Sequence, residues 1–331
     1  MRSAERQSVR VLSRFRKILE VRIDPLDIAV VAGLAVSLTS ILGFLGDVWW
    51  VLDLASHFRV QYAFILIAGA SLLFVAGRSR IGAVLLLVAI ANFVVIGPQI
   101  LGPTVLATDS DLVLRAFVAN VNTRSGNVAA VRRAITDQDP DVVILTEIDK
   151  HWLAELISIE ATHPHSIAEP RSDNFGITIF SKLPLANAEI VPLGQIDVPS
   201  VVAGFKIDGK PFYLVGTHLL PPVGFQNIRW QTEQRTELIN LVNALSPPLL
   251  LVGDLNMTNW SAAFRDLLLR TNLRDASIGR GLQPTWPVQM PPLLIPLDHC
   301  LYSKGVEILA VRIGPDVGSD HYPVTIDFVF R

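Results

Sequence analysis

The sequence has a single cysteine, and this scarcity excludes two kinds of site. Cys300 has no second cysteine with which to form an intramolecular disulfide, and it cannot by itself supply a multi-cysteine zinc site. Any metal ion must therefore be held by oxygen and histidine ligands. Internal repeats and low-complexity tracts are also missing, so unusual features of the composition must come from particular segments.

Charge is scarce as well. Only 18% of the 331 residues are charged, whereas 50% are hydrophobic, and the mean hydropathy is +0.44. An ordinary soluble protein of this length is less apolar. We therefore expect part of the chain to lie in lipid.

Three long runs without a charged residue account for the apolar excess. They cover residues 28–46, 60–77 and 81–100. Crossing a bilayer core of about 30 Å takes about 20 helical residues, so each run is long enough to span a membrane. Buried helices of a soluble protein are the alternative, but three such runs in succession argue against it. A cleaved signal peptide also fits poorly, because the first run begins late and two more follow it.

Basic residues predict the orientation of these spans. Seven of them precede residue 28, and the short sequence "RSR" between the second and third runs adds Arg78 and Arg80. Positive charge favours the cytoplasmic side. The loop at 47–59, with Trp49 and Trp50 suited to the headgroup level, would then face outward. The predicted organisation is a cytoplasmic N-terminus (1–27), a three-helix transmembrane anchor (28–105) and an extracytoplasmic domain (106–331) of a multi-pass protein of the cell (inner) membrane.

The predicted outer domain alternates strand and helix patterns. Short apolar strands such as "PDVVILTEI" and "PLLLVGDLN" are interleaved with helical spacing at 226–244 and 260–271. Strands joined as hairpins, with helices between them, indicate an α/β sandwich of mostly antiparallel sheets flanked by helices.

Polar residues recur where these strands end. They are Asn120, Asn122, Glu147, His218, Asp254, Asn256, Asp298, Asp320 and His321. Asp254 and Asn256 alone would be read as a turn and helix cap. Together with the other acids, amides and imidazoles in the same context, they indicate a site at the strand ends.

The residue types suit phosphoester chemistry. Mg²⁺ prefers carboxylate and amide oxygens, which Glu147 with Asn120 or Asn122 would supply. Hydrolysis of a phosphoester also needs donors for the developing negative charge and a group that activates water. Two histidines and three aspartates are available for those roles.

The same motifs, in this order, resemble the endonuclease/exonuclease/phosphatase family over residues 112–331. They are an N-x-N strand, a glutamate after an apolar strand, T-H-L, G-D-x-N, a D-H strand and S-D-H-x-P. The layout resembles a membrane-anchored bacterial branch that includes the teicoplanin-resistance-associated membrane proteins. The resemblance implies a four-layer α/β sandwich and a phosphoric ester hydrolase that uses Mg²⁺ or Mn²⁺.

The resemblance also implies roles for individual residues. Glu147 would be the principal metal ligand, supported by Asn120 and Asn122, with Asp320 beside the metal. His218 and Asn256 would contact the phosphate, and Asp254 would orient or deprotonate the attacking water. His321 would stabilise the transition state and Asp298 would fix its tautomer, so we expect a hydrogen bond between these two side chains.

Two departures from the family pattern limit what can be carried over. Leu297 stands before Asp298, where nuclease relatives often have a basic or polar residue. No equivalent of the tyrosine of apurinic endonucleases is evident, and Arg171 and Asn174 in "EPRSDNFG" are candidates for substrate contact or simply polar loop residues.

The net charge of the predicted outer domain helps to distinguish between possible substrates. From residue 106 onward the chain has 18 Lys and Arg against 24 Asp and Glu, a net charge of −6. Nucleic-acid binding normally needs a basic surface. The negative charge therefore argues against a nuclease. An anchored phosphoesterase with apolar loops such as "LLPPVGF" and "QMPPLLIP" is expected to act on a lipid-linked or membrane-proximal phosphoester, and no protein partner is indicated. The alternatives are an extracytoplasmic nuclease and a non-catalytic binding protein that retains the fold.

Overall fold

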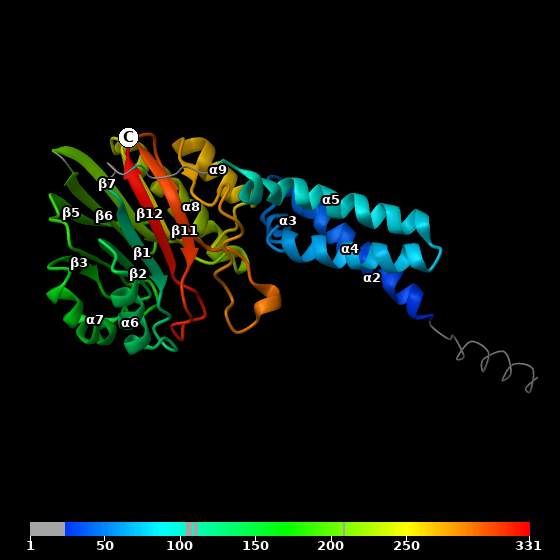
Figure 1. The fold of residues 1–331 in the computed structure, drawn as a ribbon, viewed down its shortest axis with the longest axis horizontal. Coiled ribbons are helices and arrows are strands. Elements are labelled where there is room, and N and C mark those ends of the chain that lie inside the picture. Colours follow the sequence, from blue (N-terminus) through cyan, green and yellow to red (C-terminus); the bar gives the residue numbers. More distant parts are fainter. Residues whose placement is uncertain (1–23, 104–107, 109–111, 208) are drawn as a thin grey trace, which may run out of the picture.

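The computed structural model describes residues 24–103, 108, 112–207 and 209–331. The basic segment predicted to lie in the cytoplasm falls almost wholly outside these residues. Figure 1 shows two parts, a bundle of apolar helices and a larger domain of strands and helices at one end of the bundle.

The bundle is formed by the three apolar runs of the sequence. Its elements are α2 (Pro25–Leu42), the short helix η1 (Gly43–Leu45), α3 (Trp50–Leu54), α4 (Arg59–Val75) and α5 (Ser79–Leu101). By length and composition, two stretches of the described chain could cross a membrane, Pro25–Leu45 with 21 residues and Ser79–Leu101 with 23. The third apolar helix, Arg59–Val75, has 17 residues. The sequence predicted three spans, whereas the described chain has two helices long enough to cross a membrane and one shorter apolar helix.

Apolar side chains such as Leu66, Leu73 and Leu85 fill the centre of this bundle, and many large apolar side chains are also exposed on its outside. Asn92 of α5 is fully buried and donates to Ser40 Oγ at 2.7 Å. Leu38, Phe64 and Leu87 are 58, 62 and 66% exposed. A helix of a soluble bundle normally carries polar residues on its exposed face, so the apolar outer surface of these helices is consistent with contact to lipid.

The domain that follows contains two six-stranded sheets. The first has the order β11-β12-β1-β2-β4-β3 and the second β5-β6-β7-β8-β10-β9. The strands of the first sheet are β1 (Leu114–Asn120), β2 (Val142–Thr146), β3 (His165–Glu169), β4 (Ile177–Ser181), β11 (Val306–Ile313) and β12 (Val324–Phe330). Those of the second are β5 (Asn187–Leu193), β6 (Val198–Ile207), β7 (Lys210–His218), β8 (Leu249–Asp254), β9 (Arg274–Asp275) and β10 (Asp298–Tyr302).

Both sheets are mixed, with antiparallel pairs in the majority. The pair β1/β2 is parallel in the first sheet and β7/β8 is parallel in the second. A parallel connection needs a crossover, which α6 (Val128–Gln138) and α8 (Gly224–Ala244) provide. The remaining helical elements are α7 (Lys150–Glu155), η2 (Ile157–Ala161), α9 (Ala262–Thr271) and η3 (Pro291–Leu293).

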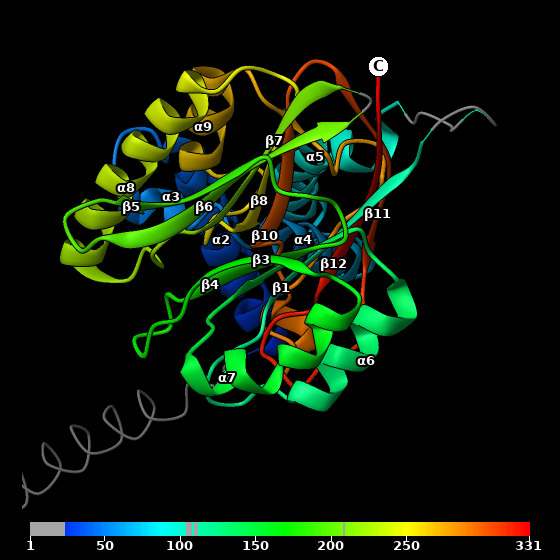
Figure 2. The same cartoon turned by 90° about the vertical axis from the view of Figure 1, so that its left-hand side faces the viewer.

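Helices cover the outer faces of the two packed sheets, as Figure 2 shows, with α6 and α7 on one side and α8 and α9 on the other. Three apolar layers follow from this arrangement. Ile144, Val252 and Leu214 belong to the core that includes residues of both sheets. Phe264 of α9 packs with residues of the second sheet, and Trp152 of α7 with residues of the first. The predicted α/β sandwich of mostly antiparallel sheets flanked by helices is confirmed.

The segment 47–58 between α2 and α4 is not a simple loop. It contains the short helix α3 and lies where the bundle meets the domain (Figure 1). The Asp53 carboxylate accepts a hydrogen bond from Ala262 N at 2.7 Å, at the start of α9. The helix bundle is therefore fastened to the domain by side chains as well as by the chain itself.

Candidate active site

The ends of the central strands bring the predicted polar residues together. Asn120 and His218 are the last residues of β1 and β7, and Asp254 is the last residue of β8. Asp298 begins the antiparallel strand β10 and lies directly opposite Asp254. Because β1/β2 and β7/β8 are parallel pairs, their carboxyl ends meet at one edge of the sandwich.

Glycine at position 253 is required by the close approach of β7 and β8. Gly253 has φ of +138°, and a Cβ built there would collide with the Thr217 carbonyl oxygen. Only glycine adopts this conformation readily. This accounts for the glycine directly before Asp254 in "VGDLN".

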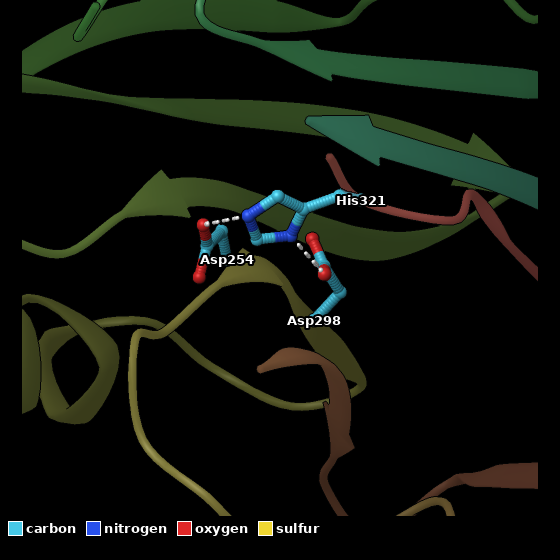
Figure 3. A group of neighbouring side chains, drawn as sticks. All are labelled: Asp254, Asp298 and His321. Atoms are coloured by element: carbon cyan, nitrogen blue, oxygen red, sulfur yellow. Dashed lines mark hydrogen bonds and ion pairs between the residues drawn. The ribbon is translucent and has the colours of Figure 1, made fainter. Parts of the chain in front are cut away.

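A buried imidazole stands between two buried carboxylates (Figure 3). His321 Nδ1 lies 2.7 Å from Asp298 Oδ2, and Nε2 lies 3.6 Å from Asp254 Oδ2. The expected contact between Asp298 and His321 is therefore present. Asp254 and Asp298 are 1 and 3% exposed, and His321 is 5% exposed, so little water screens the three groups.

Burial and mutual attraction set the protonation of this group. Burial disfavours the charged imidazole, but Asp298 and Asp254 outweigh it and raise the pKa of His321 to about 10. Burial raises the pKa of Asp254 to about 7, against the attraction of His321. Burial also opposes ionisation of Asp298, yet His321 holds its pKa below the usual value. Near neutral pH the imidazole is thus a cation that can donate a hydrogen bond.

Asn120 joins this group to Glu147. The Asn120 Nδ2 donates to Glu147 Oε1 at 2.9 Å and to Asp254 Oδ2 at 3.1 Å. Its Oδ1 accepts from the backbone of Asn122 at 3.0 Å. Asn120 therefore supports the Glu147 carboxylate as a donor. Glu147 has a positive φ of 61°, and its pKa is raised by burial. A non-glycine residue held in this conformation is typical of functional sites.

His218 and Asn122 make further contacts at this edge of the sandwich. His218 Nε2 lies 3.4 Å from both Asp254 Oδ2 and Asn256 Nδ2, and burial lowers the pKa of His218. Asn122 Nδ2 donates to Asp320 Oδ1 at 2.7 Å.

The other oxygen of Asp320 accepts from Trp286 Nε1 at 3.1 Å. Nothing in the sequence indicated Trp286, which is fixed here by a contact across 34 residues of chain. A polar network thus extends beyond the two carboxylates and the imidazole of Figure 3.

A cavity of about 780 Å³ opens onto these groups. Its polar lining includes Glu147, His218, Asp254, Asn256, Asp320 and His321. Most of its other lining side chains are apolar, and three belong to the segment 54–58, namely Leu54, His57 and Phe58. Sequence reasoning missed these three, because the pattern around them indicates only a connection between membrane helices.

Arg171 and Asn174 are placed differently from each other. Asn174 lines the cavity. The Arg171 guanidinium pairs with Asp173 and donates to the Asp197 carbonyl at 3.0 Å. Arg171 is not among the residues that line the cavity, so in this structure its interactions are those of a loop residue.

Carboxylate, amide and imidazole groups in this cavity suit a divalent cation. Atoms of Asp254, Asp298 and His321 lie within 4.8 Å of one another and are one group that could hold a metal ion. His321 Nδ1 is already engaged by Asp298, however, and a protonated imidazole is not a metal ligand. Glu147 offers another carboxylate to the cavity, and a bound cation would offset the cost of its burial.

Comparison with known proteins identifies the family. The model of the endonuclease/exonuclease/phosphatase family matches residues 118–321. No curated protein matches the chain. Among solved structures, an endonuclease/exonuclease/phosphatase from Beutenbergia cavernae is 18% identical with a TM-score of 0.56, covering 66% of this chain and 72% of its own. One from Bacteroides vulgatus has the same identity and TM-score, with coverages of 66 and 99%.

A third similar structure is D. rerio TDP2 complexed with a single-strand DNA product. It is 19% identical with a TM-score of 0.53, and the match covers 66% of this chain and 99% of that one. Likeness at these identities concerns the fold. Because the family model covers more than half of the sequence, including both the N-x-N strand and His321, this chain belongs to the endonuclease/exonuclease/phosphatase family.

Proposed function

We propose that this protein is a membrane-anchored, metal-dependent phosphoesterase that acts outside the cytoplasm. The observation that carries the proposal is one connected set of groups at the cavity: Glu147, Asp254 and His321 line it, Asn120 links Glu147 to Asp254, and Asp298 holds His321 from behind. Members of this family are generally hydrolases of phosphoesters, and each of these groups has a use in that reaction.

Glu147 would hold the metal ion, with Asn120 and Asn122 supporting the site and Asp320 beside it. Mg²⁺ or Mn²⁺ bound there would polarise a phosphoryl oxygen and neutralise part of the developing charge. Oxygen ligands suit these ions, and the single buried cysteine is not part of the site. The donor set thus favours Mg²⁺ or Mn²⁺ over zinc.

The remaining side chains would act on the phosphate and the water. His321 would donate its Nε2 proton to the phosphate in the transition state, while Asp298 holds the ring from Nδ1. Asp254 would orient or deprotonate the attacking water. His218 and Asn256 would contact phosphate oxygens, and Asn174, on the cavity wall, is available to the rest of the substrate.

Several features support a membrane location with the domain outside. The apolar helices carry exposed leucine, isoleucine and phenylalanine side chains. In Figure 1 the turn between α4 and α5 lies at the end of the bundle away from the domain. That turn contains Arg78, and Arg80 is the second residue of α5; basic residues favour the cytoplasmic side. The segment 47–58 and the domain would then share the outer side, as in the multi-pass arrangement of the teicoplanin-resistance-like branch.

A lipid-linked or membrane-proximal phosphate is the substrate that we favour. Leu220, Val223, Trp230 and Ile295 are among the apolar residues of the cavity wall, and the domain carries a net charge of −6 from residue 106 onward. D. rerio TDP2 is complexed with DNA, and an extracytoplasmic nuclease is the alternative. A nuclease would be expected to offer the phosphate backbone a basic surface.

The test is hydrolysis by the full chain in detergent. p-Nitrophenyl phosphate, bis(p-nitrophenyl) phosphate and single-stranded DNA would be assayed with EDTA, and again after Mg²⁺ is restored. We expect activity on at least one p-nitrophenyl ester that EDTA abolishes and Mg²⁺ recovers. Glu147→Gln should reduce turnover by several orders of magnitude at fixed Mg²⁺, because it removes the charge that holds the cation.

Glu155→Gln is the matched control, since Glu155 is exposed at the end of α7. Full activity in excess chelator would exclude the metal mechanism. Cleavage of DNA alone would favour the nuclease, and lack of hydrolysis of every ester would favour a binding protein that retains the fold.

A further inference from the structure

The segment 47–58, here named the anchor loop, is attached to the domain by hydrogen bonds and an ion pair. Asp53 accepts hydrogen bonds from Ala262 N at 2.7 Å and Ala263 N at 3.3 Å, the first two residues of α9. Asp47 pairs with Arg265 of the same helix at 3.0 Å. The anchor loop therefore has a defined position relative to the strand ends.

Its last part also contacts the loop that carries Asp254 and Asn256. His57 Nδ1 lies 3.0 Å from Thr258 Oγ1, in a buried contact. Trp260 Nε1 donates to the His57 carbonyl at 3.2 Å. These contacts join residues more than 200 positions apart in sequence, and they place the anchor loop beside the catalytic loop 254–261.

The anchor loop forms part of the wall of the active-site cavity. Leu54, His57 and Phe58 line the same 780 Å³ space as Glu147 and His321. A second cavity of about 390 Å³ is lined by Leu54 and His57 as well, and its lining continues to Trp49 and Trp50. The hollow surface thus extends from the catalytic groups along the anchor loop.

Most of the other residues that line the cavity are apolar. They include Phe175, Leu220, Val223, Trp286, Ile295 and Leu297. Gln61 of α4 donates to the Leu294 carbonyl at 2.8 Å, which ties this side of the cavity to the helix bundle too. A space that has charged groups and is otherwise lined mainly by apolar side chains fits a phosphate joined to an apolar alcohol.

We infer that the anchor loop forms an apolar subsite of the active site, in which Leu54 and Phe58 contact the alcohol portion of the substrate next to the scissile phosphate. The inference rests on the proposed phosphoesterase function and specifies which residues would select the substrate. The helix bundle then takes part in substrate recognition as well as attachment to the membrane.

The test compares two phosphoesters that differ only in chain length. p-Nitrophenyl methyl phosphate and p-nitrophenyl decyl phosphate would be assayed with the full chain at one fixed detergent concentration. Methyl phosphate and decyl phosphate would replace them if the enzyme cleaves monoesters alone. Leu54→Ala and Phe58→Ala should each raise KM for the decyl ester by about tenfold, because apolar contact with the chain is lost. The ratio of decyl to methyl kcat/KM should fall accordingly.

Leu269→Ala is the matched control, because Leu269 is 80% exposed on α9, away from the cavity lining. Thermal unfolding would be measured for every variant, and Phe58→Asn, which removes the apolar ring but keeps a side chain of intermediate size, replaces an alanine variant that unfolds. An unchanged decyl-to-methyl ratio in folded variants overturns the inference while leaving the phosphoesterase function standing. If the wild-type protein cleaves none of these esters, the proposed function itself fails.

Discussion

At the scale of single residues, the Asp298–His321 pair is the most informative contact. Asp298 is buried, hydrogen-bonded to Nδ1 of an imidazole, and set opposite Asp254 by the pairing of β10 with β8. A carboxylate in this position fixes which nitrogen faces the cavity and keeps the ring protonated. The two residues should therefore act as one unit.

This unit can be tested by combining substitutions. We expect His321→Ala to lower kcat/KM by about 10²–10⁴-fold, as for the loss of a positioned acid or base. Asp298→Asn should also be severe, and the double variant should be little worse than His321→Ala, because residues that act together are strongly non-additive. Steady-state kinetics of the three variants is the measurement. His151→Ala, at an exposed position on α7, is the control.

Additive losses in the double variant would show that the two residues act independently. In that case Asp298 would owe its position to the fold of β10, and its role in fixing the His321 tautomer would be withdrawn.

At the scale of elements, the start of α9 depends on the anchor loop. Ser261 caps the helix by accepting from Phe264 N at 3.1 Å, and Asp53 accepts from the two preceding backbone amides. An acidic group at a helix N-terminus satisfies free donors and interacts favourably with the helix dipole. Asp53 therefore links the stability of α9 to the helix bundle.

Asp53→Ala should destabilise the protein by about 1 kcal/mol, the typical cost of losing a capping side chain. Thermal unfolding of the full chain in detergent would detect the change. Asp47→Ala is the comparison, because its ion pair with Arg265 is exposed and such pairs contribute little. Equal effects of the two substitutions would contradict a capping role for Asp53.

The contacts of the anchor loop could not be predicted from the sequence. Strand ends such as "VILTEI" and "LVGDLN" combine a buried apolar run with a polar residue, so the sheets and most of the site could be predicted from local pattern. The contact of Asp53 with Ala262 spans 209 positions and depends on how the helix bundle meets the domain. Arg171 could not be assigned from the sequence for a different reason. It was a candidate for substrate contact, but in the structure its side chain forms an ion pair with the neighbouring Asp173.

At the scale of the whole molecule, the bundle and the domain form a structure with two distinct ends. The turn containing Arg78 lies at one end and the strands at the other (Figure 1). A membrane that surrounds the apolar helices would separate these ends. The orientation is then a property that can be measured on the living cell.

We expect a reporter fused after Arg331 to be active if it functions only outside the cytoplasm. The basic residues before residue 28 and in the "RSR" turn should hold those segments inside. A reporter that functions only in the cytoplasm should be silent at the same position and active when inserted after Arg78. The reverse pattern would place the domain in the cytoplasm and make a nucleic-acid substrate more plausible.

The pairing of β1 with β12 has a consequence for the order of events during synthesis. β1 lies between β2 and β12 in the first sheet, and the whole second sheet is inserted between them in the chain. His321 reaches the site in the loop before β12, so the nascent polypeptide cannot assemble its catalytic groups until about 200 residues after β1 have left the ribosome. If the growing chain crosses the membrane unfolded, the hydrolase becomes competent only after export, and phosphoesters inside the cell are never exposed to it.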